Sequence, residues 1–211
     1  MIAALAVVGG YTIADKVSAG KKETLPVVMY PNEVLRNVAQ PVGDIGEEER
    51  QLATLMVDTL EKTDAHGLSA PQVGVSRRII AVKLGNGVTS GFKIGVMVNP
   101  EIIAREGSSA DIESCLSLPK GRKVEVTRSD RITVRYLTLS GEEATLEVTG
   151  SDACMVQHEI DHLDGIIIID YAKKFNLDSK VVVGAIVIYA VALSVASGLY
   201  ISNRMKERKA R

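Results

Sequence analysis

Two histidines four residues apart, with a glutamate directly after the first, form the stretch of this chain best suited to chemistry. They are His158, Glu159 and His162 in "QHEIDHLDG", residues 157–165. Residues four apart lie on one face of an α-helix, so the two imidazoles could bind one metal ion. Glu159 would lie close enough to accept a proton from an ion-bound water. The pattern predicts a hydrolytic metal site; the alternative is a helix with two surface histidines.

A third metal ligand is needed, because a catalytic zinc-type site usually has three protein ligands and one open position for water. The chain after His162 has no further histidine, and Asp164 and Asp170 do not stand at a familiar protease spacing. Cys115 lies upstream in "ESCLSLP", residues 113–119, where flanking Ser and Pro indicate a loop or strand end. As a thiolate it would complete a Cys-His-His site.

The element that must carry both histidines is a helix. Ser151 or Asp152 is suited to cap its start, and Gly165 is suited to end it. An apolar stripe on this helix is expected to face the core, formed by Val156, Ile160 and Leu163. Cys154 lies one turn before the first histidine, and we expect it to be a small buried residue.

The rest of the chain predicts one globular domain of mixed helix and strand. Its 211 residues and 46% hydrophobic content allow a real core, and a net charge of −1 gives no basic field for nucleic acid. Residues 47–63 indicate an amphipathic helix that buries Leu52, Leu55, Met56 and Leu60. Four further runs predict strands, at residues 77–84, 92–103, 131–139 and 143–150.

Three motifs, taken in order, resemble the signature motifs of the peptide deformylases. They are "GLSAPQVG" at residues 67–74, "ESCLS" at residues 113–117 and the "QHEIDHLDG" stretch. "VVMYPNEVLRNVAQPV", residues 27–42, is similar to the N-terminal segment of that family, and the resemblance covers about residues 26–172. It implies an α+β fold of mostly antiparallel strands around a central metal-binding helix. It also implies removal of the formyl group from the formyl-methionine that begins new polypeptides.

The resemblance implies a role for each site residue. The metal ligands would be Cys115, His158 and His162. They would hold one divalent ion, Fe²⁺ in cells, with Zn²⁺, Ni²⁺ or Co²⁺ as alternatives. Glu159 would carry a proton from water to the leaving amine. The Gln72 side chain and the Leu116 backbone N–H would stabilise the oxyanion. Glu113 would pair with Arg128 and hold the Cys115 loop rigid.

The substrate-binding residues implied by the resemblance include departures from the family pattern. Gly67 fits a position where substrate backbone runs close to the protein. His66 stands where an apolar residue usually lines the methionine pocket, so it would narrow or polarise that pocket or turn to solvent. Ala65 replaces a glycine, Ser69 replaces an alanine, and Ser151 occupies a position that is often apolar. We expect these changes to affect side-chain preference more than catalysis.

The two ends of the chain predict contact with a membrane. We expect an apolar N-terminal segment over residues 1–25, a catalytic domain over 26–175 and a C-terminal segment over 176–211. Residues 181–203 carry no charge and would span about 34 Å as a helix, enough for a bilayer core of about 30 Å. A small-residue stripe there could pack against a partner helix, formed by Ala190, Ser194 and Gly198.

The orientation of this predicted span is ambiguous in the sequence. The basic tail after residue 203 favours a cytoplasmic tail and, with one span, an external domain. Lysines between residues 16 and 22 favour an internal domain if the N-terminal segment also inserts. Formylated chains emerge from ribosomes, so we expect the domain to face a bacterial cytoplasm or an organelle interior, close to ribosomes that make membrane proteins.

Two other functions are alternatives on the sequence alone. A membrane-tethered metalloprotease could use the same HEIDH pattern, although Cys115 and Gln72 disfavour it. A non-enzymatic membrane subunit could retain an old deformylase domain, which the altered residue at His66 would permit. A protease would cut unformylated substrates at internal bonds, and a non-enzymatic subunit would lose its metal.

Overall fold

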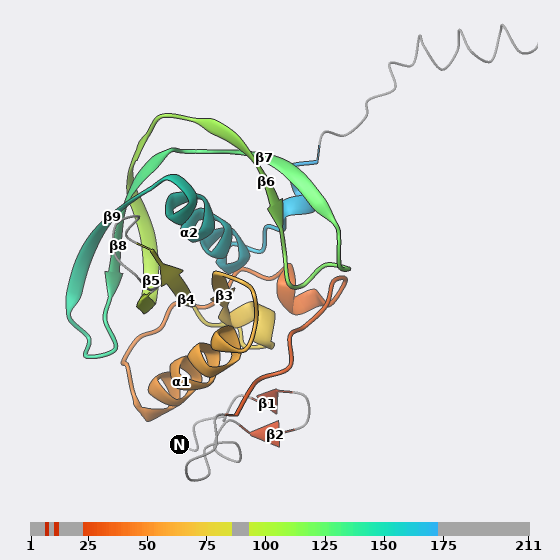
Figure 1. The fold of residues 1–211 in the computed structure, drawn as a ribbon. Coiled ribbons are helices and arrows are strands. Elements are labelled where there is room, and N and C mark those ends of the chain that lie inside the picture. The colour runs from red at the N-terminus through yellow and green to blue at the C-terminus, as the bar shows by residue number, and fades with distance from the viewer. Residues whose placement is uncertain (1–6, 9–10, 13–22, 86–92, 173–211) are drawn as a thin grey trace, which may run out of the picture. The chain divides into compact units, whose positions relative to one another are not determined.

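The computed structural model describes residues 7–8, 11–12, 23–85 and 93–172, drawn in colour in Figure 1. These residues belong to one compact unit that runs to Ala172. The predicted membrane span at residues 181–203 lies outside the described residues. Within the described ranges, no helix is both long enough and apolar enough to cross a bilayer. Near the N-terminus, β1 (Val7–Val8) pairs antiparallel with β2 (Tyr11–Thr12).

The main sheet has five strands, and all neighbours within it are antiparallel. Their order is β3 (Gly67–Ser69), β4 (Ile79–Leu84), β5 (Lys93–Glu106), β8 (Arg131–Leu137) and β9 (Glu143–Thr149). Four of these are the strands that the sequence predicts. On β8, Ile132 and Val134 are buried while Arg131 is exposed, which is the alternation that identifies a half-buried strand. The mostly antiparallel α+β fold expected from the sequence is therefore confirmed.

A second, two-stranded sheet was not expected. It pairs β6 (Ser109–Ser114) with β7 (Lys123–Arg128). On β7, Val124, Val126 and Arg128 point inward, whereas most of β6 is exposed and shows no apolar alternation. This sheet matters for the site, because Cys115 directly follows β6 and Arg128 ends β7.

Helix α1 (Glu47–Glu61) forms as predicted. The Glu49 carboxylate accepts a hydrogen bond of 2.9 Å from the Gly46 N–H, which satisfies one donor at the helix start. Its predicted apolar face is buried in the core against β3 and β4, through Leu52, Leu55, Met56 and Leu60. The helix therefore packs against β3, the strand on which the first motif begins.

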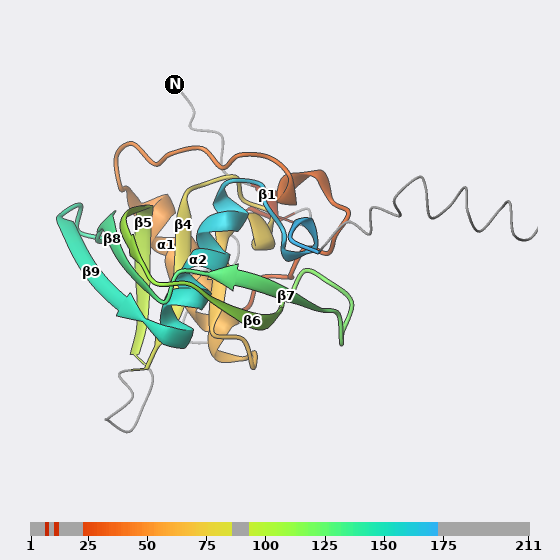
Figure 2. The same cartoon turned by 90° about the horizontal axis from the view of Figure 1, so that it is seen from above.

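Helix α2 (Gly150–Leu163) lies between the main sheet and the β6–β7 sheet (Figures 1 and 2). The predicted apolar stripe is buried against β4, β5 and β8, through Val156, Ile160 and Leu163. The predicted helix end is also confirmed, because Gly165 follows the helix with a φ of +72°, which glycine adopts without strain.

The predicted start of α2 was wrong. The helix begins at Gly150, after an N-cap at Thr149, so Ser151 and Asp152 lie inside its first turn. Asp152 instead accepts a hydrogen bond of 3.1 Å from the Gly85 N–H at the end of β4. A carboxylate in the first turn interacts favourably with the positive end of the helix dipole. Here the Asp152 carboxylate also links the helix to the main sheet.

Three short 3₁₀ helices complete the described fold. They are η2 (Glu33–Leu35), η3 (Ala70–Val73) and η4 (Ile168–Asp170). An apolar cluster joins η2 and η4 to the β6–β7 sheet through Leu35, Leu118, Val124, Val126, Ile167 and Ile168. The segment that carries Cys115 is thus held by this apolar cluster as well as by the pairing of β6 with β7.

Candidate metal centre

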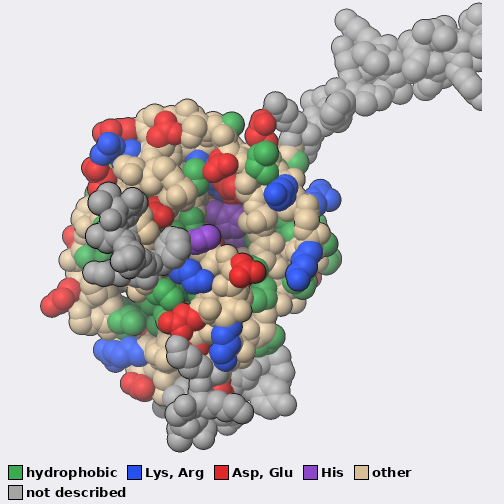
Figure 3. Space-filling model, in the orientation of Figure 1, with side chains coloured by type: hydrophobic (Ala, Val, Ile, Leu, Met, Phe, Trp, Pro, Cys, Tyr) green, Lys and Arg blue, Asp and Glu red, His purple; other side chains and the backbone are tan. Residues whose placement is uncertain are grey.

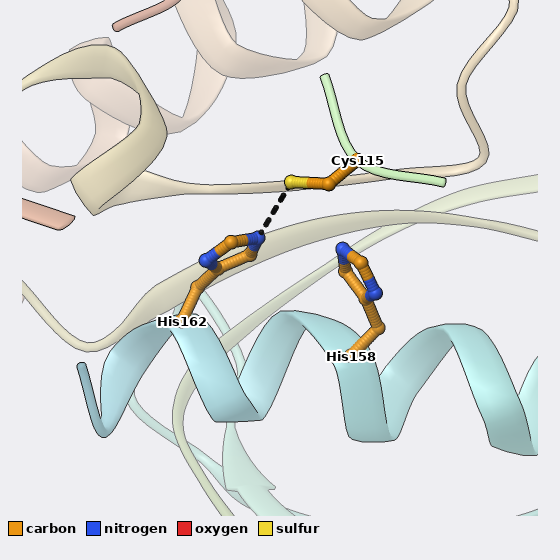
Figure 4. Close-up of side chains that lie close together, drawn as sticks. All are labelled: Cys115, His158 and His162. Atoms are coloured by element: carbon orange, nitrogen blue, oxygen red, sulfur yellow. Dashed lines mark hydrogen bonds between the residues drawn. The ribbon is translucent and has the colours of Figure 1, made fainter. Parts of the chain in front are cut away.

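The two histidines of α2 and the cysteine after β6 come together in space. One ligand atom from each of Cys115, His158 and His162 lies within 4.8 Å of the others. Cys115 Sγ is 3.2 Å from His162 Nε2, and both imidazole rings extend from α2 toward the cysteine (Figure 4). The i, i+4 spacing accounts for the two histidines, and the β6–β7 pairing brings the cysteine to them.

Glu113 fixes the orientation of the His158 ring. Its Oε2 lies 2.7 Å from His158 Nδ1. Burial alone would raise the pKa of Glu113, but hydrogen bonds from His158 and Arg128 outweigh it and hold that pKa at about 2. The ionised carboxylate only accepts, so Nδ1 carries the hydrogen and Nε2 is the atom left for a metal.

The electrostatics of the cluster favour a cation. Burial alone would lower the pKa of His158, yet hydrogen bonding with Cys115 and Glu113 raises it to about 10. Burial, reinforced by the charges of His158 and Arg128, lowers the pKa of His162 to about 3, so this ring is neutral. Surroundings that stabilise a proton on His158 also stabilise a metal ion in place of that proton. His162 is already in the neutral form in which imidazole binds metal.

These residues fit a divalent transition metal. A thiolate and two imidazoles suit Fe²⁺, Zn²⁺, Ni²⁺ or Co²⁺, and three protein ligands leave a position for water. Among the residues that the structure describes, this is the only group of three or more His, Cys, Asp or Glu side chains whose ligand atoms lie close enough together to hold a metal ion. The Nδ1 atom of His162 is buried with no hydrogen-bond partner in that part of the chain.

Glu159 lies beside the cluster with one carboxylate oxygen uncommitted. The side chain is buried, and its Oε2 has no hydrogen-bond partner within the described ranges. Burial raises the pKa of Glu159 to about 7, which is the range in which a carboxyl group can both accept and donate a proton. A Cβ added at Gly67 would lie 2.4 Å from Glu159 Oε1. Gly67 therefore makes room for Glu159, a reason for glycine that the sequence did not suggest.

Gln72 is held with its amide nitrogen toward the cluster. Its Oε1 accepts hydrogen bonds from the Ser69 N–H at 2.9 Å and the Ser69 hydroxyl at 3.0 Å. The Nε2 atom consequently points the other way and lies 3.6 Å from Cys115 Sγ. Ser69, for which the resemblance implies a substrate contact, is fully buried and is not among the residues that line the cavity beside the cluster, so that contact stays a prediction. Leu116, next to Cys115, is half-buried and lines the cavity that opens onto the cluster.

Arg128 joins Glu113 to the helix that carries the histidines. Its guanidinium donates to both Glu113 oxygens, from Nε at 2.7 Å and from Nη2 at 3.1 Å. Its Nη1 donates to Asp161 Oδ2 at 2.5 Å. The Tyr171 hydroxyl donates to the same Asp161 oxygen at 2.9 Å. Sequence reasoning missed Asp161 and Tyr171; the position of Asp161 between the two histidines was the available signal.

A cavity of about 780 Å³ opens onto the cluster, and Figure 3 shows histidine side chains at a hollow of this face. His66, which is exposed, and Ser151 line it, as the sequence allowed. The prediction for Cys154 was wrong, because this residue is half-buried and lines the cavity with Met155. Burial raises the pKa of Cys154, so its thiol stays protonated and differs in character from a metal-binding cysteine.

Comparison with known proteins points to one family. Residues 24–177 match the family model described as polypeptide deformylase. A peptide deformylase of Desulfitobacterium hafniense is 41% identical over 148 residues, which are 70% of this chain and 94% of that protein. A peptide deformylase of Alkalilimnicola ehrlichii is 40% identical over 152 residues, or 72% of this chain and 84% of that protein.

Solved structures agree with these relatives. The crystal structure of peptide deformylase from Thermotoga maritima has a TM-score of 0.65 at 36% identity, covering 70% of this chain and 97% of that one. A Met-Ala-Ser-bound class I type b peptide deformylase from Acinetobacter baumannii has a TM-score of 0.66 at 34% identity, covering 71% and 99%.

Proposed function

The chain belongs to the peptide deformylase family and removes the N-formyl group from new polypeptides, and we propose that this hydrolysis takes place at Cys115, His158 and His162. The observation that carries the proposal is the convergence of these three ligand atoms within 4.8 Å, with Cys115 and His158 lining a cavity of about 780 Å³. Three ligands of this type leave room for one water, which a hydrolase needs.

The ligand set holds one divalent ion in this proposal, with Fe²⁺ as the ion in cells. An ion held by Cys115, His158 and His162 would lower the pKa of a bound water toward about 7 and would so supply hydroxide near neutral pH. The soft thiol, the neutral His162 and the negative surroundings of His158 support a divalent transition metal at the cluster.

Glu159 is the proton carrier in the proposed reaction. It accepts the proton of the attacking water and delivers it to the leaving nitrogen, so the products are formate and a peptide with a free N-terminus. Its uncommitted Oε2 and its pKa of about 7 suit both steps. The Gln72 amide and the Leu116 N–H donate hydrogen bonds to the negative charge that develops on the formyl oxygen.

The formyl-methionyl end of the substrate enters the cavity above this cluster. The related Acinetobacter baumannii protein is described as bound to Met-Ala-Ser, and we propose that this chain binds a peptide in its own cavity. Gly67, Cys154 and Met155 line the inner wall, while His66 and Ser151 lie at the exposed edge. His66 and Ser151 make that edge more polar than a pocket for methionine alone requires.

We also propose that residues 181–203 anchor the enzyme in a membrane. The uncharged run is long enough to span a bilayer, and the basic tail after it suits an interface. The catalytic domain, about residues 26–175, would face the bacterial cytoplasm or an organelle interior near ribosomes. A partner helix would pack on the small-residue stripe of this run. Recovery of the full chain in the soluble fraction of gently lysed cells would exclude the anchor.

The first test measures formate release from a short formyl-methionyl peptide. The full chain is purified without oxygen, loaded with Fe²⁺ and compared with Glu159→Gln. We expect activity in the native protein and a loss of at least about a hundredfold in the variant, with the metal retained. Cleavage of unformylated peptides at internal bonds would indicate a protease instead, and failure to hold metal would indicate a non-enzymatic domain.

A further inference from the structure

A continuous set of contacts joins Tyr171 to the candidate metal ligand His158. The Tyr171 hydroxyl donates to Asp161, and Arg128 donates to the same carboxylate oxygen. Arg128 also donates two hydrogen bonds to Glu113, and Glu113 accepts a hydrogen bond from His158 Nδ1. Tyr171 lies just after η4, near the end of the described chain and outside the three motifs.

The aromatic ring of Tyr171 makes a second contact, with the guanidinium of Arg128. The Arg128 guanidinium carbon lies 4.9 Å from the ring centroid, so the ring covers one face of the cation. The Arg128 side chain is only 4% exposed, while Tyr171 is 39% exposed and lies between the arginine and solvent. Covering the guanidinium keeps water from competing for its hydrogen bonds, which strengthens the contacts to both carboxylates.

We propose that Tyr171 is a positioning residue for the metal centre, acting through Asp161 and Arg128 on the Glu113 carboxylate that orients His158. The proposal rests on the ligand set given under the proposed function. Arg128 has fixed planar geometry, so a shift of its Asp161 contact also tilts the fork that holds Glu113. Burial, aided by the Asp161 carboxylate, raises the pKa of Tyr171 to about 12, so the hydroxyl stays a donor at neutral pH.

The test separates the hydroxyl of Tyr171 from its ring. Tyr171→Phe removes the hydrogen bond to Asp161 and keeps the ring over Arg128, whereas Tyr171→Leu removes both. Tyr30→Phe is the matched control. Tyr30 is equally exposed at 39%, and its ring lies 5.2 Å from the Arg36 guanidinium carbon. Arg36 pairs with Asp170, so the control perturbs the same end of the fold without touching Glu113 or Asp161.

The readout is Co²⁺ bound to the metal-free full chain. The visible absorption spectrum reports the geometry of the ligands, and the rate of Co²⁺ transfer to an excess of chelator reports how firmly they are held. We expect release about three- to tenfold faster in Tyr171→Phe with a shifted spectrum, and still faster release in Tyr171→Leu. Tyr30→Phe should stay within about twofold of the native rate.

Two results would overturn the proposal. One is a Tyr171→Phe variant that matches Tyr30→Phe in both spectrum and release rate. The other is a Tyr171→Phe variant whose metal-free form melts at a lower temperature while its Co²⁺ spectrum is native, because that describes packing alone. If Tyr171→Leu does not fold, the comparison of the two Phe variants still decides.

Cys115→Ser distinguishes failure of this inference from failure of the proposed ligand set. If the native chain binds no Co²⁺, or if Cys115→Ser binds it as well and with the same spectrum, the ligand set is wrong and the inference fails with it. If Cys115→Ser changes the spectrum while Tyr171→Phe does not, the ligand set stands and only the role of Tyr171 is refuted.

Discussion

The backbone of Gly67 lies directly against the carboxylate of Glu159. A Cβ atom added at residue 67 would lie 2.4 Å from Oε1 and 2.6 Å from Cγ of that side chain. Gly67 is on β3 and Glu159 is on α2, so the close approach of these two elements sets the position of the proposed base. Glycine is required there for space, and no unusual φ is involved.

Gly67→Ala should therefore displace Glu159 and lower the rate of deformylation. We expect a fall in kcat of about a hundredfold with the metal still bound, since the base moves and the three ligands do not. The measurement is formate release alongside metal content. Gly95→Ala, on β5, is the control, because the nearest atom to a Cβ added there is Leu84 Cδ1 on β4, at an ordinary 3.9 Å. Near-native activity of Gly67→Ala would show that Glu159 is free to move away without loss.

Ser69→Ala should weaken the hold on Gln72. The variant loses the hydroxyl hydrogen bond of 3.0 Å to Gln72 Oε1 and keeps the backbone hydrogen bond of 2.9 Å. One neutral hydrogen bond is worth about 1 kcal/mol, so we expect kcat/KM to fall by about three- to tenfold. Steady-state kinetics with a formyl-methionyl peptide measure the change.

Ser117→Ala is the matched control for the serine variant. Ser117 is also fully buried, but its hydroxyl has no hydrogen-bond partner within the described ranges. Removing it should leave kcat/KM within about twofold of native and should not destabilise the fold. An equal loss in both variants would mean that Gln72 is oriented by its backbone contact alone.

The positions of Ser69 and Gly67 illustrate what the sequence could and could not reveal. Hydrophobic periodicity identified α1, α2 and four strands, because each of these elements buries one regular face. The β6–β7 sheet escaped notice, since most of β6 is exposed and its pairing is fixed by β7. Motif resemblance named the candidate ligands, yet only the folded chain shows that Ser69 lies behind Gln72 and that Cys154 faces the cavity.

Glu113 should make the metal-free protein sensitive to acid. Its pKa in the fold is about 2, below the ordinary value of 4.5, so its stabilising effect is complete above about pH 4.5. That effect is lost as the pH falls from 4.5 toward 2. We expect Glu113→Gln to be less stable than the native chain by a few kcal/mol at pH 6, with the difference shrinking toward pH 2.

Urea unfolding of the metal-free proteins at several pH values between 6 and 2 measures this difference. Over this range His158 stays protonated in the native fold, because its pKa there is raised to about 10. Glu101→Gln is the control, because it removes an exposed ion pair with Arg135. A gap between native and Glu113→Gln that is constant with pH would contradict the proposed charge of Glu113.

Arg128→Lys should loosen the metal while leaving every proposed ligand in place. Lysine has one nitrogen and no planar fork, so it cannot reach both Glu113 oxygens and Asp161 as Arg128 does. Glu113 would then hold His158 less firmly, and we expect metal affinity to fall by about ten- to a hundredfold. Competition with a chelator of known affinity measures it. Arg135→Lys alters an exposed ion pair with Glu101 in the same chemical way and should not change affinity. Equal affinities in the two lysine variants would show that the charge of Arg128 suffices and that its fork is not needed.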